Sequence, residues 1–133
     1  RLAEEQCLDY IISDGPPGIG CPVISSLSGV NLALIITEPT LSGMHDLDRV
    51  ANVCRHFGVP VIVCVNKHDL NLDNTHQIED YCRDHGINMA GRISYDNVVT
   101  EALVHGVPVI EYSRNGVAQE IERLWDTVVR HLS

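Results

Sequence analysis

The sequence predicts an α/β protein built on a mostly parallel, doubly wound sheet flanked by helices. Short apolar runs alternate with longer stretches whose apolar residues recur at helical spacing. The runs 31–37 and 59–65 are continuously apolar and rich in β-branched residues, which is typical of strands covered on both faces. Such alternation implies right-handed crossovers between parallel strands. Because 133 residues can bury one proper core, we expect a single domain over residues 1–133.

Five apolar runs are expected to form strands. The first covers residues 8–13 and is followed directly by an acid, the next two cover 31–37 and 59–65, and shorter strands are expected at 87–94 and 107–112. No strand of this set leads into a lysine-bearing phosphate loop, so the predicted sheet is a partial one that lacks the phosphate-loop strand of nucleotide-binding folds.

Helices are expected between these strands. One follows Ser42, its predicted N-cap, and ends before Gly58. A second runs from Thr75 to His85, with Asp73 or Asn74 as its cap. Two more are expected at 97–105 and at 117–132, and the last of these has one clear apolar stripe.

The composition excludes several classes of partner. The formal net charge is −9, whereas a nucleic-acid backbone or an anionic membrane surface requires clustered Lys and Arg. No apolar run approaches the ~20 residues that a membrane-spanning helix needs. We therefore expect neither nucleic acid as a partner nor a membrane span.

The five cysteines predict a reduced, cytoplasmic protein. Their number is odd and no Cys-x-x-Cys pair occurs, so neither a disulfide framework nor a zinc or iron–sulfur site is indicated within this segment.

The stretch 14–20 predicts a metal and phosphate site. Asp14 ends an apolar run, and a carboxylate at a strand end can hold Mg²⁺, usually through a coordinated water. Gly18 lets the backbone approach a terminal phosphate and donate its N–H, and Pro16 and Pro17 stiffen the loop that presents it. The alternative is a simple turn capped by the acid.

Two further polar residues directly follow predicted strands. Glu38 comes after the second strand and Asn66 ends the third. In doubly wound sheets, ligands bind outside the carboxyl ends of the strands. We therefore expect Asp14, Glu38 and Asn66 to lie at one lip of the sheet.

Residues 66–69 read Asn-Lys-His-Asp, a pattern that guanine-binding NTPases use to read the base. There Asp69 would accept hydrogen bonds from guanine, and the stem of Lys67 would pack over the ring. The alternative is a polar loop between a strand and a helix.

One half of a nucleotide site is missing from the sequence. A phosphate loop needs glycines followed by Lys and Ser or Thr, but Lys67 is the only lysine of the chain. The chain also begins at Arg1 without a Met. Both observations lead us to expect the C-terminal segment of a longer protein.

Four segments together resemble the ParA/MinD group of P-loop ATPases. They are residues 14–22, 37–49, 65–71 and 91–96, and they occur in the family's order through most of the chain. The resemblance extends to the branch of MinD-like ATPases that carries an inserted ferredoxin-type domain with two 4Fe–4S clusters.

The resemblance implies specific roles for residues of this chain. Asp14 would be the switch acid near Mg²⁺, and Gly18 the amide near the γ-phosphate. Asn66 would contact adenine, and the loop containing Tyr95 and Asp96 would close over the base. The remaining residues expected at the nucleotide site are Gly15, Pro16, Pro17, Glu38, Lys67 and Asp69.

The resemblance also implies cofactors and partners. ATP and Mg²⁺ would bind the intact protein, and the phosphate loop and the 4Fe–4S insert would lie upstream of Arg1. Two intact subunits would form a homodimer through the nucleotide face, with a redox or metal-cofactor carrier protein as a further partner. The isolated segment is expected to hydrolyse nothing.

Two other functions remain open from the sequence. The order of the motifs also suits a GTPase fragment that reads guanine through residues 66–69. Alternatively, the chain is a non-catalytic module on which a partner protein docks, with the motifs as inherited relics.

Overall fold

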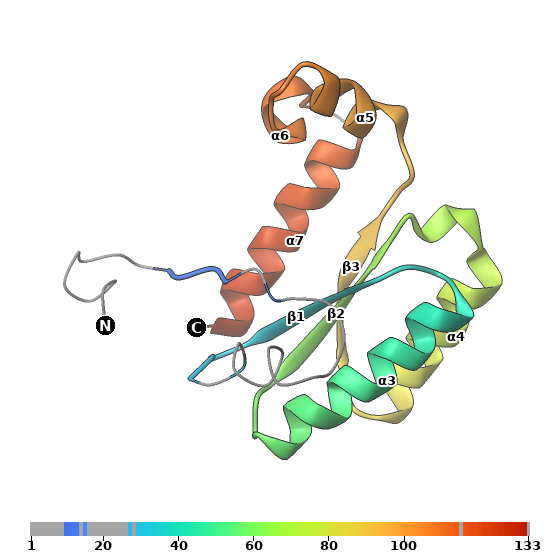
Figure 1. Ribbon diagram of the computed structural model, residues 1–133, viewed down its shortest axis with the longest axis vertical. Helices are drawn as coiled ribbons and strands as arrows, with labels where there is room; N and C mark the ends of the chain where they lie inside the picture. The colour runs from blue at the N-terminus through green and yellow to red at the C-terminus, as the bar shows by residue number, and fades with distance from the viewer. Residues whose placement is uncertain (1–9, 14, 16–26, 28, 115, 133) are drawn as a thin grey trace.

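A three-stranded parallel sheet forms the centre of the protein. The structure is a computed structural model that describes residues 10–13, 15, 27, 29–114 and 116–132. The strands β1 (Ala33–Thr37), β2 (Val61–Asn66) and β3 (Asn88–Ile93) lie in the order β1-β2-β3 (Figure 1). Both pairings are parallel, which confirms the predicted fold class.

Helices cover both faces of this sheet (Figure 1). On one face lie α3 (Leu41–His56) and α4 (Leu72–Asp84), and on the other lies α7 (Val117–Leu132). The side chains buried beneath α3 and α4 are Leu47, Val63, Val65, Ile78 and Cys82. Those buried beneath α7 are Ile62, Cys64, Ala90 and Leu124. Alternate residues of β2 therefore point to opposite cores, as a strand buried on both faces requires.

The helix caps differ from the predicted ones. Thr40, rather than Ser42, caps α3, because its hydroxyl accepts the Gly43 N–H at 2.9 Å. Asn71, rather than Asp73 or Asn74, caps α4, with its side-chain oxygen 3.0 Å from the Asn74 nitrogen. A cap needs extended backbone just before the first turn, and both observed caps have it.

The prediction of a strand at 107–112 is wrong. After α5 (Asn97–Val104), the chain forms the short helix α6 (Val109–Tyr112), and the Pro108 carbonyl accepts both the Glu111 and Tyr112 N–H groups. Both helices lie beyond the sheet, at the N-terminal end of α7 (Figure 1). None of the strands in the described part of the chain pairs with this segment, so the local i to i+3 and i+4 hydrogen bonds satisfy its backbone instead.

The prediction of a strand at 8–13 is wrong for its described part. Residues 10–13 form no strand, and Ile12 is 80% exposed. Tyr10 instead packs edge-on against Trp125 of α7, with ring centroids 5.3 Å apart. β-Branched composition favours a strand only where a neighbouring strand supplies hydrogen bonds, and none of the three described strands pairs with these residues.

Within the ranges that the structure describes, none of the helices has the length and apolar composition needed to cross a bilayer.

Candidate functional site

The loops that follow the three strands converge at one edge of the sheet. β1 ends at Thr37 opposite Val65, and the last residue of β2, Asn66, pairs with Ile93 of β3. Because the strands are parallel and end in register, Glu38, Asn66 and the loop after Ile93 share the carboxyl edge. The predicted placement of Glu38 and Asn66 at one lip is therefore confirmed.

An ion pair joins the first two of these loops. Lys67 Nζ lies 3.3 Å from Glu38 Oε1, and the two side chains are 41% and 54% exposed. Lys67 has a left-handed backbone, with φ of 56°, which turns the chain sharply after β2. An exposed pair of this kind contributes at most about 1 kcal/mol, so a ligand can displace it at small cost.

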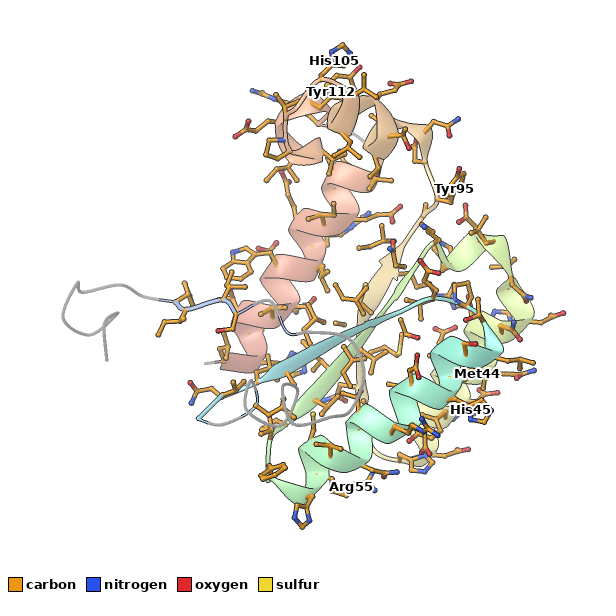
Figure 2. The ribbon with its side chains drawn as sticks, in the orientation of Figure 1. Met44, His45, Arg55, Tyr95, His105 and Tyr112 are labelled. Carbon is orange, nitrogen blue, oxygen red and sulfur yellow. The ribbon has the colours of Figure 1, made fainter. Side chains whose placement is uncertain are left out.

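A second contact joins the loops after β2 and β3. Asp69, in the 3₁₀ helix η1 (His68–Leu70), accepts the Tyr95 N–H at 2.8 Å. This hydrogen bond holds the pKa of Asp69 below its ordinary value. Tyr95 itself is 52% exposed and points outward beside the edge (Figure 2).

Asp96 has a structural role in addition to any ligand contact. Its carboxylate accepts the Val98 N–H at 2.9 Å and caps α5. The loop 94–96 is thus anchored at both ends, by the sheet before it and by a helix cap after it.

Sequence reasoning missed a hydrogen-bonded group next to this edge. Glu120, in the first turn of α7, accepts the Ser94 N–H at 2.7 Å and the Ser94 hydroxyl at 2.8 Å. His68 Nε2 lies 3.3 Å from Ser94 Oγ. Successive members are 26 residues apart, so no local spacing could have revealed the group.

The predicted phosphate and metal residues cannot be placed. Asp14, Pro16, Pro17 and Gly18 lie outside the described residues, and Gly15 lies in exposed chain. Within residues 29–114 and 116–132 and the few described before them, no three His, Cys, Asp or Glu side chains are grouped to hold a metal ion. The roles predicted for the stretch 14–18 stay predictions.

The described cysteines do not form a cluster site. Cys54, Cys64 and Cys82 are free and fully buried, and each belongs to a different hydrophobic core cluster. Burial raises the pKa of the Cys64 and Cys82 thiols to about 11, so they stay protonated at neutral pH.

His45 and Asp48 lie on the exposed surface of α3. Asp48 accepts the Tyr81 hydroxyl at 2.6 Å, which ties α3 to α4. Burial and that carboxylate raise the pKa of Tyr81 to about 12. His45 is exposed on α3 beside Met44 (Figure 2).

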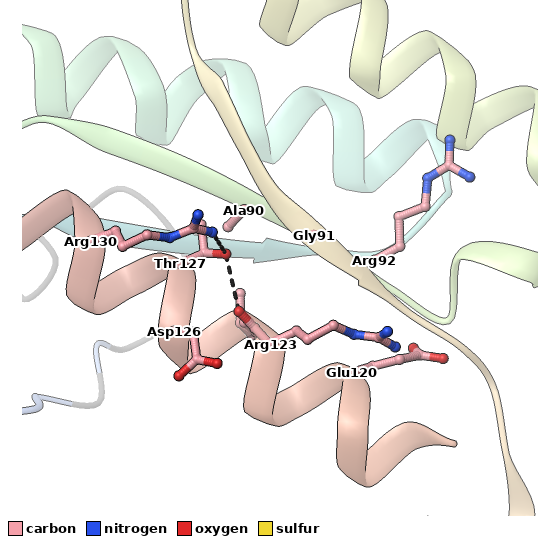
Figure 3. A pocket seen from close by; sticks show the side chains of 9 residues that line it. Ala90, Gly91, Arg92, Glu120, Arg123, Asp126, Thr127 and Arg130 are labelled. Carbon is pink, nitrogen blue, oxygen red and sulfur yellow. Dashed lines mark hydrogen bonds between the residues drawn. The ribbon is translucent and has the colours of Figure 1, made fainter. Parts of the chain in front are cut away.

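A groove of about 780 Å³ runs between β3 and α7. Arg123 and Arg130 line it from α7, while Arg92 extends to the other side of the β3 ribbon (Figure 3), where it pairs with Glu79. Glu120 also lines the groove, so this hollow adjoins the carboxyl edge through that side chain.

Comparison with known proteins identifies a family. The ParA family model, described as NUBPL iron-transfer P-loop NTPase, matches residues 3–132. A relative named as an iron–sulfur cluster carrier protein, from Pyrococcus horikoshii, is 25% identical over 139 aligned positions, covering 94% of this chain and 46% of the relative.

Two solved structures share the fold. The cell division ATPase MinD of Pyrococcus furiosus has a TM-score of 0.80 at 22% identity, covering 96% of this chain and 54% of that one. MinD of Pyrococcus horikoshii, solved with Mg-ADP, has a TM-score of 0.74 at 21% identity, covering 86% and 48%. At such identities the likeness establishes the fold alone.

The chain spans less than half the length of the curated relatives it matches. These likenesses support neither the guanine-reading alternative nor the non-catalytic docking module.

Proposed function

This chain belongs to the ParA family of NUBPL iron-transfer P-loop NTPases, and from that premise we propose that it forms the base-binding half of an Mg-ATP site. One observation carries the proposal. The loops after β1, β2 and β3 meet at one sheet edge, fastened by the Lys67–Glu38 ion pair and by the Asp69–Tyr95 hydrogen bond. This edge is where doubly wound sheets bind their ligands.

The described residues at this edge fit a nucleotide base. The Asn66 amide offers both a donor and an acceptor, which matches the alternating edge of adenine. The loop carrying Tyr95 and Asp96 would lie against the ring, and the Tyr95 side chain, about half exposed, would pack on it. The stem of Lys67, which follows Asn66 directly, would pack beside the base.

The phosphate end of the site is assigned to the stretch 14–18. Asp14 would hold Mg²⁺ through a coordinated water, and Gly15, Pro16 and Pro17 would present the Gly18 N–H to the γ-phosphate. Mg²⁺, when bound, neutralises charge on the phosphates.

Hydrolysis needs a cation at the phosphates, and the one lysine of this sequence, Lys67, lies at the base end. We assign that cation to a glycine-rich phosphate loop elsewhere in the protein. Two subunits would then meet through the nucleotide face as a homodimer, and the stretch 14–20 would respond to hydrolysis.

The process served is proposed to be iron–sulfur chemistry. The family description and the carrier protein from Pyrococcus horikoshii support it. The three described cysteines are buried apart from one another, so any cluster would be held by other residues or by a redox or metal-cofactor carrier partner.

Nucleotide titration of the full-length protein tests the proposal. We expect Mg-ATP to bind more tightly than Mg-GTP in isothermal titration calorimetry. Asn66→Ala should weaken ATP binding about tenfold, since a buried base contact is lost. Asn88→Ala, at the opposite end of the sheet, is the matched control and should bind normally.

Absence of ATP binding would overturn the proposal. Tighter binding of GTP, lost on Asp69→Ala, would instead establish the guanine-reading alternative.

A further inference from the structure

Glu120, Ser94 and His68 form a hydrogen-bonded chain that links α7 to the candidate base site. The Glu120 carboxylate receives two hydrogen bonds from Ser94, at 2.7 Å from the backbone nitrogen and 2.8 Å from the hydroxyl. The Ser94 hydroxyl in turn lies 3.3 Å from His68 Nε2. Figure 3 shows Glu120 extending from α7 beside β3.

The direction of these hydrogen bonds follows from the chemistry of the groups. An ionised carboxylate can only accept, so the single hydroxyl proton of Ser94 is committed to Glu120. Ser94 Oγ must therefore accept from the ring of His68. In its neutral form, His68 then carries its proton on Nε2, and Nδ1 is left as an acceptor.

Nothing else among the described residues competes for the ring. His68 Nδ1 is buried without a hydrogen-bond partner in this part of the chain. The backbone around it is fixed, because the Thr75 hydroxyl donates to the His68 carbonyl at 2.8 Å. The tautomer of His68 is thus decided by Ser94, and through Ser94 by Glu120.

The same carboxylate sets the start of the base-covering loop. Glu120 holds the Ser94 N–H, and the next N–H, from Tyr95, is held by Asp69. Two successive backbone N–H groups are therefore hydrogen-bonded to different elements, the first to α7 and the second to η1. Hydrogen bonds to charged acceptors are the stronger ones.

We propose that Glu120 is a positioning residue for the base site: it fixes the Ser94–Tyr95 loop and, through the Ser94 hydroxyl, the tautomer of His68. This inference rests on the proposed function as far as the base is concerned. The hydrogen-bond chain itself does not depend on any nucleotide.

The tautomer is tested by ¹⁵N NMR of the His68 ring at a pH where the ring is neutral. The wild-type chain should show the proton on Nε2. In Glu120→Gln, the new amide group can accept the Ser94 N–H and donate to Ser94 Oγ, so the hydroxyl must turn toward His68. The proton should then move to Nδ1. A wild-type proton on Nδ1, or no change in Glu120→Gln, overturns the hydrogen-bond chain.

The positioning role is tested by comparing two ligands of the full-length protein. Glu120→Ala should weaken Mg-ATP binding about tenfold, since the loop loses a charged anchor. Binding of Mg-tripolyphosphate, which has no base, should stay unchanged. Glu122→Ala, the same change at an exposed acid two residues along α7, is the matched control and should leave both affinities unaltered.

The outcomes separate the two proposals. A wild-type protein that fails to bind ATP overturns the proposed function, while the NMR result still decides the hydrogen-bond chain. ATP binding that is equally tight in wild type and Glu120→Ala overturns the positioning role alone. Should Glu120→Ala fail to fold, Glu120→Gln replaces it: its neutral amide is a weaker anchor for the Ser94 N–H than the carboxylate, so Mg-ATP binding should weaken while Mg-tripolyphosphate binding stays unchanged. Mg-ATP binding as tight as in the wild type then overturns the positioning role.

Discussion

The two faces of the sheet are packed differently. Beneath α3 and α4, the side chains of Val63, Val65, Ile78 and Cys82 have no exposed surface. Beneath α7 the burial is less complete: Ile62 and Cys64 are closed off, but Ala90 and Leu124 are 9% exposed. Ile36, which alternation places on this face of β1, is 56% exposed. Two helices cover the first face, and one covers the second within the described residues.

This difference indicates a division of roles. The α3/α4 face holds the larger closed core and should dominate stability. The α7 face contributes less burial but carries Glu120, the side chain that reaches the carboxyl edge. We therefore expect α7 to contribute mainly by holding the loop at the carboxyl edge through Glu120, and the α3/α4 face to contribute most of the stability.

The largest expected effect is at Ile78. Ile78→Ala should lower the free energy of unfolding by about 2–5 kcal/mol, because it removes three methyl or methylene groups from a fully closed core. Ile36→Ala, the matched change on the exposed part of the other face, should alter it by no more than about 0.5 kcal/mol. Urea unfolding measures both, and equal losses would contradict the distinction between the faces.

The next effect is expected at Gly43, in the first turn of α3. A methyl group there would overlap the Glu38 carbonyl oxygen and lie 2.8 Å from Thr37 Oγ1. Gly43→Ala should therefore cost about 1–3 kcal/mol despite the better helix propensity of Ala. The exposed Ser42→Ala is the control and should be nearly neutral, whereas Thr40→Ala should cost about 1 kcal/mol as a lost cap. Thermal melts that rank Ser42→Ala as the worst of the three would restore the predicted cap.

The smallest expected effect is a loss of stability at alkaline pH. Buried thiols on both faces of the sheet contribute to it. Burial, with a smaller contribution from Glu120, raises the pKa of Cys64 from 9.0 to about 11. Burial, with a smaller contribution from Glu79, does the same for Cys82. The folded state keeps these protons while the unfolded state releases them, so stability is fully present below pH 9 and is lost as the pH rises toward 11.

Unfolding free energies measured from pH 8 to 10 should therefore fall by about 1 kcal/mol per thiol. Cys64→Ala and Cys82→Ala should each remove the contribution of one thiol to this decrease of the unfolding free energy with pH, whatever they do to stability at pH 7. A slope that survives in the double variant would assign the alkaline loss to other groups. Stopping at pH 10 limits the contribution of Tyr81, whose pKa of about 12 also exceeds its ordinary value.

The elements predicted well are those whose local pattern and tertiary setting agree. The continuous apolar run 31–37 contains β1, and the run 59–65 covers β2 except for its last residue, Asn66, because a strand buried on both faces needs such a run. The helical spacing after Val117 likewise gave α7. The position of Glu38 and Asn66 at one edge followed from parallel topology alone.

The elements predicted wrongly are those that needed a neighbouring strand or a particular backbone geometry. Residues 10–13 and 107–112 have strand-like composition, yet a strand forms only where another strand offers its hydrogen bonds. The caps of α3 and α4 lie two or more residues before the predicted ones, since several Ser, Thr, Asn and Asp side chains stand near each start and only backbone geometry chooses among them.

By itself, the sequence determined the fold class, the family and the polar residues that end the strands, because hydrophobic periodicity and short motifs are local properties of the chain. Only the tertiary structure decided which distant groups meet. Glu120, Ser94 and His68 are each 26 residues from the next, and they meet because α7 packs along β3 with its N-terminal end at the carboxyl edge. This packing arrangement is tertiary, and no short stretch of sequence encodes it.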